Sequence, residues 1–176
     1  VCEGYAKAMK LLLDEIGVKC RIVNGTSMGM NHAWNMVKLE EDYYHVDVTW
    51  DDPLLSDGKQ ILVYNYFNLN DQEISKSHSW NKSKYPKCNS TKYNYYYYYN
   101  FIVKNLRELY QKIDGSLTKG MEVLEVKILD SNVDKYDIPK IVNKLVLERR
   151  YHYNGLSYSY NVNEDLNIIR IEFKYE

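Results

Sequence analysis

The apolar residues at the start of the chain recur with the period of an α-helix. They fall three or four positions apart, at Cys2, Tyr5, Met9, Leu12 and Ile16. This spacing places them on one face of a helix. Gly17 follows the last of them, at a position where a helix is expected to end. The pattern therefore predicts a helix that begins near Cys2 and ends before Gly17.

The segments that follow alternate apolar and polar residues, which is typical of strands. Strands are predicted at Val18–Asn24, His32–Leu39, Tyr43–Thr49 and Ile61–Leu69. Glu40 and Glu41 are predicted to form a two-residue hairpin loop, although they lack the Gly or Asn that such loops favour. With this loop, Leu39 pairs with Asp42.

The hairpin register decides which polar side chains meet. In this register His32 lies opposite Thr49, and Trp34 lies opposite Asp47. Side chains alternate between the two faces of a strand, so these four share one face. His32 and Asp47 then become diagonal neighbours within reach of a hydrogen bond. A loop of three residues would instead place them on opposite faces.

The pattern changes near residue 100, after a connector over residues 81–92 that is rich in Lys, Asn and Ser. Helices are predicted at Phe101–Ile113 and Ile138–Arg150, and strands at Val123–Leu129, Leu156–Val162 and Ile168–Tyr175. The expected fold class is α+β, with a small α+β unit following the first core. We predict a core over residues 1–92 and an accessory unit or extension of the core over residues 93–176.

Charge and composition exclude several classes of protein. The formal net charge is −1, which argues against a general binder of nucleic acid or anionic membranes. No apolar run approaches the roughly 20 residues that span a bilayer. The three cysteines do not suggest a disulfide framework. Cys20 lies in a predicted strand and is expected to be buried, whereas Cys88 lies in the polar connector and is expected to be exposed.

The candidate chemistry begins with Cys2 in the first turn of the predicted helix. Unpaired amides and the helix dipole there favour a thiolate, although Cys2 could equally be the first buried residue of the apolar stripe. His32 is suited to take the thiol proton, and Asp47 to orient the imidazole. Trp34 and Trp50 are candidates for lining a substrate cleft, with a role in the core equally open.

Three further features carry weaker signals. His78 lacks the strand context and acidic partner of His32, so it is not predicted to be catalytic. Asp51 and Asp52 are adjacent acids without further ligands nearby, so no metal and no other cofactor is predicted. The run Tyr95–Tyr99 could stack on sugars or bases. The chain contains 19 tyrosines, however, which favours a general composition bias, and we expect the run to enter or bridge the second unit.

Three motifs occur in an informative order. They are Cys-Glu-Gly-Tyr-Ala at residues 2–6, His-Ala-Trp-Asn at 32–35 and Val-Asp-Val-Thr-Trp-Asp-Asp at 46–52. Together they resemble the core of the transglutaminase-like superfamily, and most of all its bacterial members. The resemblance covers roughly residues 1–85. It departs from the common pattern at Glu40–Glu41, where a Gly-containing turn is usual, and at Tyr43, where Trp is usual.

The resemblance implies a papain-like arrangement in which a cysteine helix packs on a small antiparallel sheet. Carried over to this sequence, Cys2 is the nucleophile, His32 the base and Asp47 the orienting acid. A substantial segment precedes the cysteine in this superfamily and often helps to bind the oxyanion. The chain begins one residue before Cys2. We therefore expect it to be part of a longer protein, in which case this piece alone could be folded without being active.

These features lead to three hypotheses for function. The first is an enzyme that forms a thioester at Cys2, either a cysteine protease-like hydrolase of peptide or amide bonds or a transglutaminase acting on protein substrates. The second is a catalytically silent domain for binding or scaffolding. The third is a carbohydrate-binding or cell-wall-binding module that uses the tyrosine run. By analogy with bacterial members, we expect an extracellular or cell-surface location.

Overall fold

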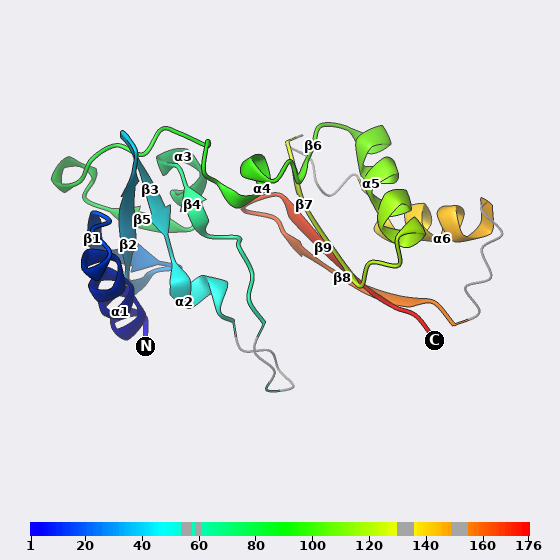
Figure 1. The fold of residues 1–176 in the computed structure, drawn as a ribbon, viewed down its shortest axis with the longest axis horizontal. Helices are drawn as coiled ribbons and strands as arrows, with labels where there is room; N and C mark the ends of the chain where they lie inside the picture. Colours follow the sequence, from blue (N-terminus) through cyan, green and yellow to red (C-terminus); the bar gives the residue numbers. More distant parts are fainter. Residues whose placement is uncertain (54–57, 59–60, 130–135, 149–154) are drawn as a thin grey trace. The chain divides into compact units, whose positions relative to one another are not determined.

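The computed structural model spans residues 1–176 and describes all of them except 54–57, 59–60, 130–135 and 149–154. The chain forms two compact units, Val1–Tyr99 and Asn100–Glu176 (Figure 1). Each unit contains helices and a sheet of its own, which confirms the α+β fold class. The functional roles predicted for residues 1–92 and 93–176 stay predictions.

The first unit is built around a five-stranded antiparallel sheet with the strand order β4-β3-β2-β1-β5. Its elements are α1 (Cys2–Glu15), β1 (Cys20–Ser27), β2 (Met30–Leu39), β3 (Asp42–Val46), α2 (Val48–Asp51), β4 (Phe67–Leu69), α3 (Asp71–Ile74), β5 (His78–Trp80), the 3-10 turn η1 (Lys82–Lys84) and α4 (Tyr95–Tyr98). Helix α1 packs along this sheet (Figure 1).

Helix α1 begins and ends where the sequence predicts, and Gly17 has a φ of +76° just beyond it. The buried face differs from the predicted stripe. Met9 and Leu13 pack against a small core cluster on the sheet, while Leu12 and Ile16 are exposed. Three consecutive leucines allow two registers of the apolar face, and the packed register is the one that continues through Ala6 and Met9 to Leu13.

The β2–β3 hairpin has the predicted register. Leu39 pairs with Asp42 and Asn35 pairs with Val46, and the two-residue loop is accommodated by a φ of +53° at Glu40. The predicted strand Tyr43–Thr49 is too long, because β3 ends at Val46. The expected pairing of His32 with Thr49 is therefore wrong, since the chain turns into α2 after Val46.

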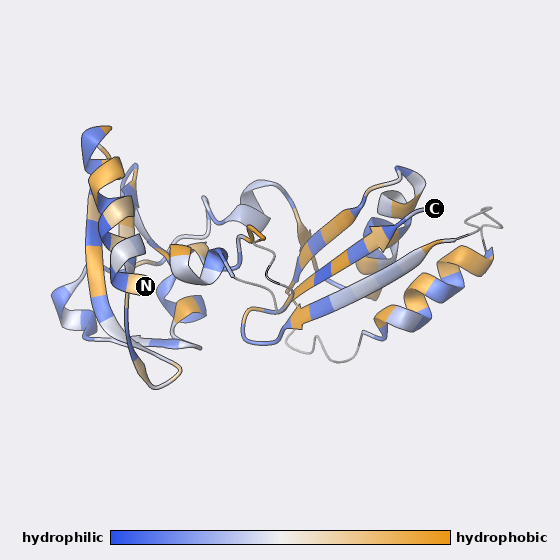
Figure 2. Cartoon of the chain, turned by 90° about the horizontal axis from the view of Figure 1, so that it is seen from below, coloured by the Kyte–Doolittle hydropathy of each residue, from blue (hydrophilic) through white to orange (hydrophobic). Residues whose placement is uncertain are grey.

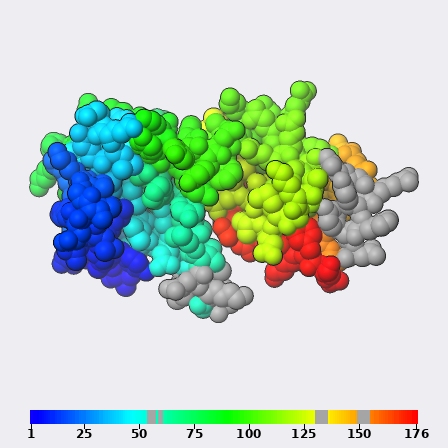
Figure 3. Space-filling view, in the orientation of Figure 1, coloured from blue at the N-terminus to red at the C-terminus, as the bar shows by residue number. Residues whose placement is uncertain are grey.

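Three other expectations in the first unit need correction. The predicted strand Ile61–Leu69 is reduced to β4 at its end, Phe67–Leu69. Cys88 is buried, with 1% of its surface exposed, although its polar neighbours suggested exposure. The tyrosine run lies in the first unit, where α4 begins after the capping side chain of Asn94. Tyr96 is buried, whereas Tyr98 is exposed, and the green segment around residues 90–100 reaches the surface in Figure 3.

The second unit contains a four-stranded sheet with the order β6-β7-β9-β8, in which β6 and β7 are parallel and the other two pairs are antiparallel. Its elements are β6 (Ile102–Val103), α5 (Leu106–Thr118), β7 (Val123–Ile128), α6 (Ile138–Glu148), β8 (Ser157–Asn163) and β9 (Ile168–Lys174). The apolar side chains of α5 and α6 share one core with alternate residues of β7 and β9, and Figure 2 shows this alternation along the strands.

The second unit follows the prediction except at its start. The predicted helix Phe101–Ile113 is divided into β6 and α5, because Asn105 caps a helix by accepting a hydrogen bond from the Glu108 backbone N–H at 3.0 Å. Helix α6 ends at Glu148, and the predicted end at Arg149–Arg150 lies outside the described residues. The predicted C-terminal hairpin is confirmed as β8 and β9.

Candidate functional site

Asp47 follows the last residue of β3 and caps α2, so it does not lie within a strand as the sequence predicted. Its carboxylate caps α2, where Oδ1 accepts hydrogen bonds from the backbone N–H groups of Thr49 at 3.1 Å and Trp50 at 3.3 Å. Its own N–H donates to the carbonyl oxygen of Tyr66 at 3.1 Å. These contacts occupy Oδ1 and leave Oδ2 available for other hydrogen bonds. The side chain is wholly buried, so the carboxylate is fixed in position by the backbone around it.

His32 on β2 is joined to this carboxylate. The distance between His32 Nε2 and Asp47 Oδ2 is 2.6 Å, so the predicted meeting of these two side chains does occur. The ring of Trp34 stacks beside His32 at a centroid distance of 6.0 Å, and Trp50 meets its edge at 6.4 Å. Among the described residues, no hydrogen bond engages His32 Nδ1. The imidazole is thus held at one nitrogen and unengaged at the other.

His78 on β5 binds the same carboxylate oxygen, which the sequence reasoning did not anticipate. Its Nε2 lies 2.9 Å from Asp47 Oδ2, and its ring centroid lies 5.5 Å from that of His32. The prediction that His78 lacks an acidic partner and strand context was therefore wrong. The alternation of His78 and Trp80, both buried around exposed Ser79, was the one available signal, but a three-residue strand is too short to recognise.

Cys2 is the first residue of α1 and is partly exposed. The structure ties the first turns of this helix to the neighbouring elements. Tyr5 donates from its hydroxyl to Asp52 just after α2 at 2.5 Å, and Asn35 of β2 donates to the carbonyl oxygen of Ala6 at 2.9 Å. Within the part of the chain that the structure describes, no hydrogen bond joins the Cys2 thiol to His32 or Asp47. The structure thus unites two members of the predicted triad, and the third lies on the helix beside them.

The comparisons with known proteins address this same segment. The sequence model of the transglutaminase-like superfamily matches residues 1–48, which include Cys2, His32 and Asp47. The resemblance is confirmed over this segment. The chain is also 34% identical over 80 residues to a protein named kyphoscoliosis peptidase in both mouse and human. That match covers 38% of this chain and 12% of each relative.

A second histidine–aspartate pair is linked to this site through the ring of Trp34. His45 Nδ1 accepts a hydrogen bond from the indole N–H of Trp34 at 3.0 Å, and His45 Nε2 lies 2.9 Å from Asp71 Oδ1. Because an indole nitrogen can only donate, the proton of neutral His45 must be on Nε2. Burial lowers the pKa of His45 and outweighs the hydrogen bond to Asp71, which acts in the opposite direction. Burial also raises the pKa of the neighbouring Cys88 thiol.

Within the described residues, two groups of side chains bring three potential metal ligands together. One is His32, Asp47 and His78, and the other is His45, Asp71 and Cys88; the ligand atoms of each group lie within 4.8 Å of one another. A cation on His45 Nε2 would require a proton on Nδ1, and that position faces the indole N–H. The tautomer of His45 therefore opposes metal binding in the second group.

The adjacent acids Asp51 and Asp52 have structural partners. Asp51 Oδ1 accepts a hydrogen bond from the backbone N–H of Tyr66 at 2.7 Å, and Asp52 is the partner of Tyr5. Neither acid belongs to the two groups described above. These contacts give both carboxylates a role in holding α1, α2 and the segment before β4 together.

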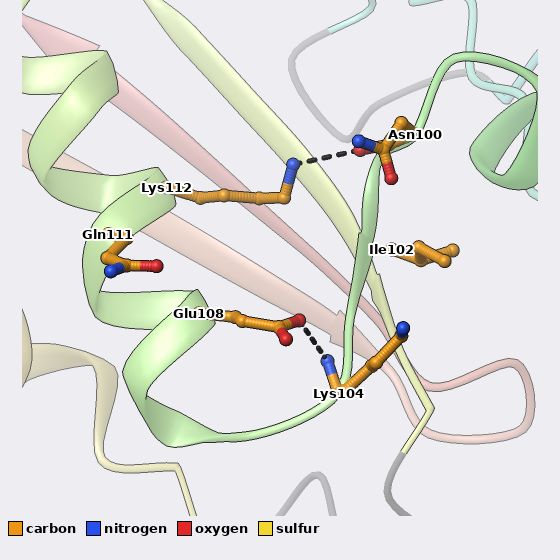
Figure 4. A pocket seen from close by; sticks show the side chains of 6 residues that line it. All are labelled: Asn100, Ile102, Lys104, Glu108, Gln111 and Lys112. Atoms are coloured by element: carbon orange, nitrogen blue, oxygen red, sulfur yellow. Dashed lines mark hydrogen bonds between the residues drawn. The ribbon is translucent and has the colours of Figure 1, made fainter.

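The second unit contains a polar pocket beside α5 (Figure 4). Its volume is about 350 Å³, and it is lined by Asn100, Ile102, Lys104, Glu108, Gln111 and Lys112. The ammonium of Lys112 donates to the carbonyl oxygen of Asn100 at 2.8 Å, and Glu108 accepts from the backbone N–H of Lys104 at 2.8 Å. These contacts use the charged side chains of Glu108 and Lys112 to join α5 to the segment that precedes it.

None of the helices that the structure describes is long and apolar enough to span a membrane.

Proposed function

We propose that the first unit catalyses thiol-dependent acyl transfer through a thioester at Cys2, with hydrolysis of a peptide or amide bond in a protein substrate as its reaction. The observation that carries the proposal is the buried hydrogen bond between His32 and Asp47, which leaves His32 Nδ1 unengaged. Cys2 begins the adjacent helix, and all three residues lie in the segment that matches the superfamily.

The residues have distinct roles in the acylation half of the reaction. His32 Nδ1 takes the thiol proton, and the Cys2 sulfur attacks the carbonyl carbon of the substrate. When the tetrahedral intermediate collapses, the bond from carbon to nitrogen breaks and His32 returns its proton to the leaving amine. Asp47 keeps the imidazole oriented and stabilises its positive charge. The buried position of Asp47 strengthens this interaction, because little water screens it.

The second half of the reaction determines whether the product is hydrolysed or cross-linked. Water attacks the thioester, gives a proton to His32, and releases the acid as the Cys2 sulfur regains its proton. A lysine amine in place of water would give transglutamination through the same intermediate. The mouse and human relatives are both named as a peptidase, and this supports water as the acceptor. Location outside the cell or at its surface remains a prediction from the resemblance to bacterial members.

One observation favours a second candidate function, a catalytically silent domain for binding or scaffolding. No hydrogen bond links the Cys2 thiol to His32 within the described residues. In free enzymes such contacts are often long and tighten only when substrate binds. The two functions differ in whether His32 controls the reactivity of Cys2.

The deciding experiment measures alkylation of Cys2 by iodoacetamide across a range of pH, with mass spectrometry of each cysteine. For an enzyme, Cys2 reacts rapidly at pH values well below the ordinary thiol value of about 8.5, and His32→Ala abolishes this reactivity. Cys20 and Cys88 are buried and serve as internal controls. Ordinary thiol behaviour of Cys2, unchanged in His32→Ala, would support the silent domain instead.

A further inference from the structure

His78 is a buried titratable residue that the proposed chemistry does not use. Its imidazole has no exposed surface, and it lies among the rings of Trp34, Trp50 and Tyr66 at centroid distances of 4.9, 5.7 and 5.5 Å. Burying a polar ring is unfavourable unless both nitrogens have partners. Its two nitrogens are engaged by Ser77 Oγ at 2.8 Å and by Asp47 Oδ2 at 2.9 Å.

The partners of Asp47 determine where the protons on His78 must be. Oδ1 accepts from two backbone N–H groups, and Oδ2 faces both His32 and His78. An ionised carboxylate can only accept hydrogen bonds, so each ring presents an N–H to Oδ2. This leaves Nδ1 of neutral His78 as an acceptor, and the hydroxyl of Ser77 can donate to it. The arrangement satisfies every donor and acceptor without a charge on His78.

A neutral His78 also fits the charge balance of the site. When His32 takes the thiol proton, one positive charge faces the single negative charge of Asp47. A second positive charge on His78, with its ring centroid 5.5 Å from that of His32, would oppose protonation of His32. The titratable groups that face His78 among the described residues are His32, Asp47, Tyr66 and, beyond the ring of Trp34, His45.

We propose that His78 is a positioning residue, which donates a hydrogen bond to Asp47 Oδ2 and thereby keeps the carboxylate aligned on His32. This inference rests on the proposed function. Hydrogen bonds from two rings hold the ionised carboxylate in one orientation. Without the donor on His78, the Asp47 carboxylate is less well aligned on His32, and it stabilises less strongly the imidazolium that accompanies a reactive Cys2.

The backbone places His78 for this role. In β5, His78 pairs with Ser27 of β1, and the carbonyl oxygen of Ser77 accepts hydrogen bonds from the Ser27 hydroxyl at 3.2 Å and the Met28 N–H at 3.3 Å. These contacts attach β5 to the edge of the sheet. A short strand in the polar second half of the unit thus delivers a side chain to the Asp47 carboxylate, which follows β3 and caps α2.

Two variants of equal length test the proposal. His78→Gln keeps an N–H donor that can reach Asp47, whereas His78→Met fills a similar volume without one. Ser79→Ala changes the exposed neighbour on the same strand and serves as the control. The measurement is the rate of Cys2 alkylation against pH in the full chain, with tryptophan fluorescence to verify that each variant is folded.

In His78→Met, we expect the acidic limb of the Cys2 profile to move to higher pH by on the order of one unit, because one hydrogen bond to a charged group is lost. The rate at pH 5 then falls about tenfold. His78→Gln and Ser79→Ala retain the wild-type profile. If His78→Met does not fold, His78→Asn replaces it, since its shorter amide cannot reach Oδ2.

The possible failures are distinguishable. If Cys2 of the wild-type chain behaves as an ordinary thiol, the proposed function itself is wrong. If wild-type Cys2 is reactive and His32-dependent but a folded His78→Met or His78→Asn variant has the same profile, His78 does not position Asp47. Equal shifts in the glutamine and methionine variants would also overturn the proposal, because they would reflect shape rather than the hydrogen bond.

Discussion

Gly25 on β1 is the position at which the smallest change should disturb the site most. It pairs with His32 on one side and with Trp80 on the other. A Cβ atom placed on Gly25 would lie 2.1 Å from the backbone carbonyl oxygen of Ser79 and 2.9 Å from the ring of Trp34. We predict that Gly25→Ala destabilises the first unit and displaces β5 together with His78.

The magnitude follows from these contacts. Real Cβ atoms essentially never approach another heavy atom more closely than 3.0 Å, so β1 and β5 must separate by about 1 Å. The clashing oxygen belongs to the backbone, so no side-chain rotation relieves it. Overpacking costs about 1–3 kcal/mol, and weakening the short β1–β5 pairing adds about 1 kcal/mol for each hydrogen bond lost. We expect a loss of about 3 kcal/mol.

The assay is urea unfolding followed by tryptophan fluorescence. All three tryptophans of the chain, Trp34, Trp50 and Trp80, lie in the first unit, so this signal reports on that unit. With a slope of about 2 kcal/mol per molar urea, the midpoint falls by about 1.5 M. Gly4→Ala is the control, since a Cβ there meets nothing within 4 Å and alanine favours the helix. A midpoint for Gly25→Ala within about 0.3 M of wild type would refute the reasoning.

Two further predictions concern the second histidine–aspartate pair. Because burial lowers the folded-state pKa of His45, its contribution to stability is present above the unfolded value of about 6.5 and is lost as the pH falls through the lowered pKa. The urea midpoint should thus drop more steeply between pH 7.5 and 5.5 in wild type than in His45→Gln, and equal slopes would contradict this. Cys88 is 1% exposed and its pKa is raised by burial; iodoacetamide should label it at least about 100-fold more slowly than Cys2 in the native chain and readily in urea, as mass spectrometry can test.

The sequence predicts the hairpin that carries His32 because two local rules agree there. Alternation with a period of two fixes the face of each side chain, and the two-residue loop fixes the register. The same local logic succeeds for β8 and β9. It fails after Val46, because an aspartate that caps a helix and an aspartate that continues a strand can have the same apolar neighbours. Even so, His32 and Asp47 meet, since the bend at the end of β3 still directs the carboxylate to the predicted face.

The residues that distant segments bring to the two histidine–aspartate pairs were not predictable in this way. His78 and Cys88 each lie in a stretch dominated by Lys, Asn and Ser, where local polarity indicates an exposed loop. Their burial depends on backbone contacts far along the chain, such as the Asp71 N–H donating to the Cys88 carbonyl oxygen at 2.7 Å. Tertiary contacts of this kind leave no periodic signal in a short segment.

The two histidine–aspartate pairs also show why one is suited to chemistry and the other is not. Both nitrogens of His45 are engaged, one by the Trp34 indole and one by Asp71, so this ring cannot accept a proton without losing a hydrogen bond. His32 is held by Asp47 alone and retains a free nitrogen among the described contacts. Trp34 links the pairs, because it donates to His45 and stacks beside His32. We infer that the His45–Asp71 pair holds the Trp34 ring in place, and that this ring in turn orients the imidazole of His32.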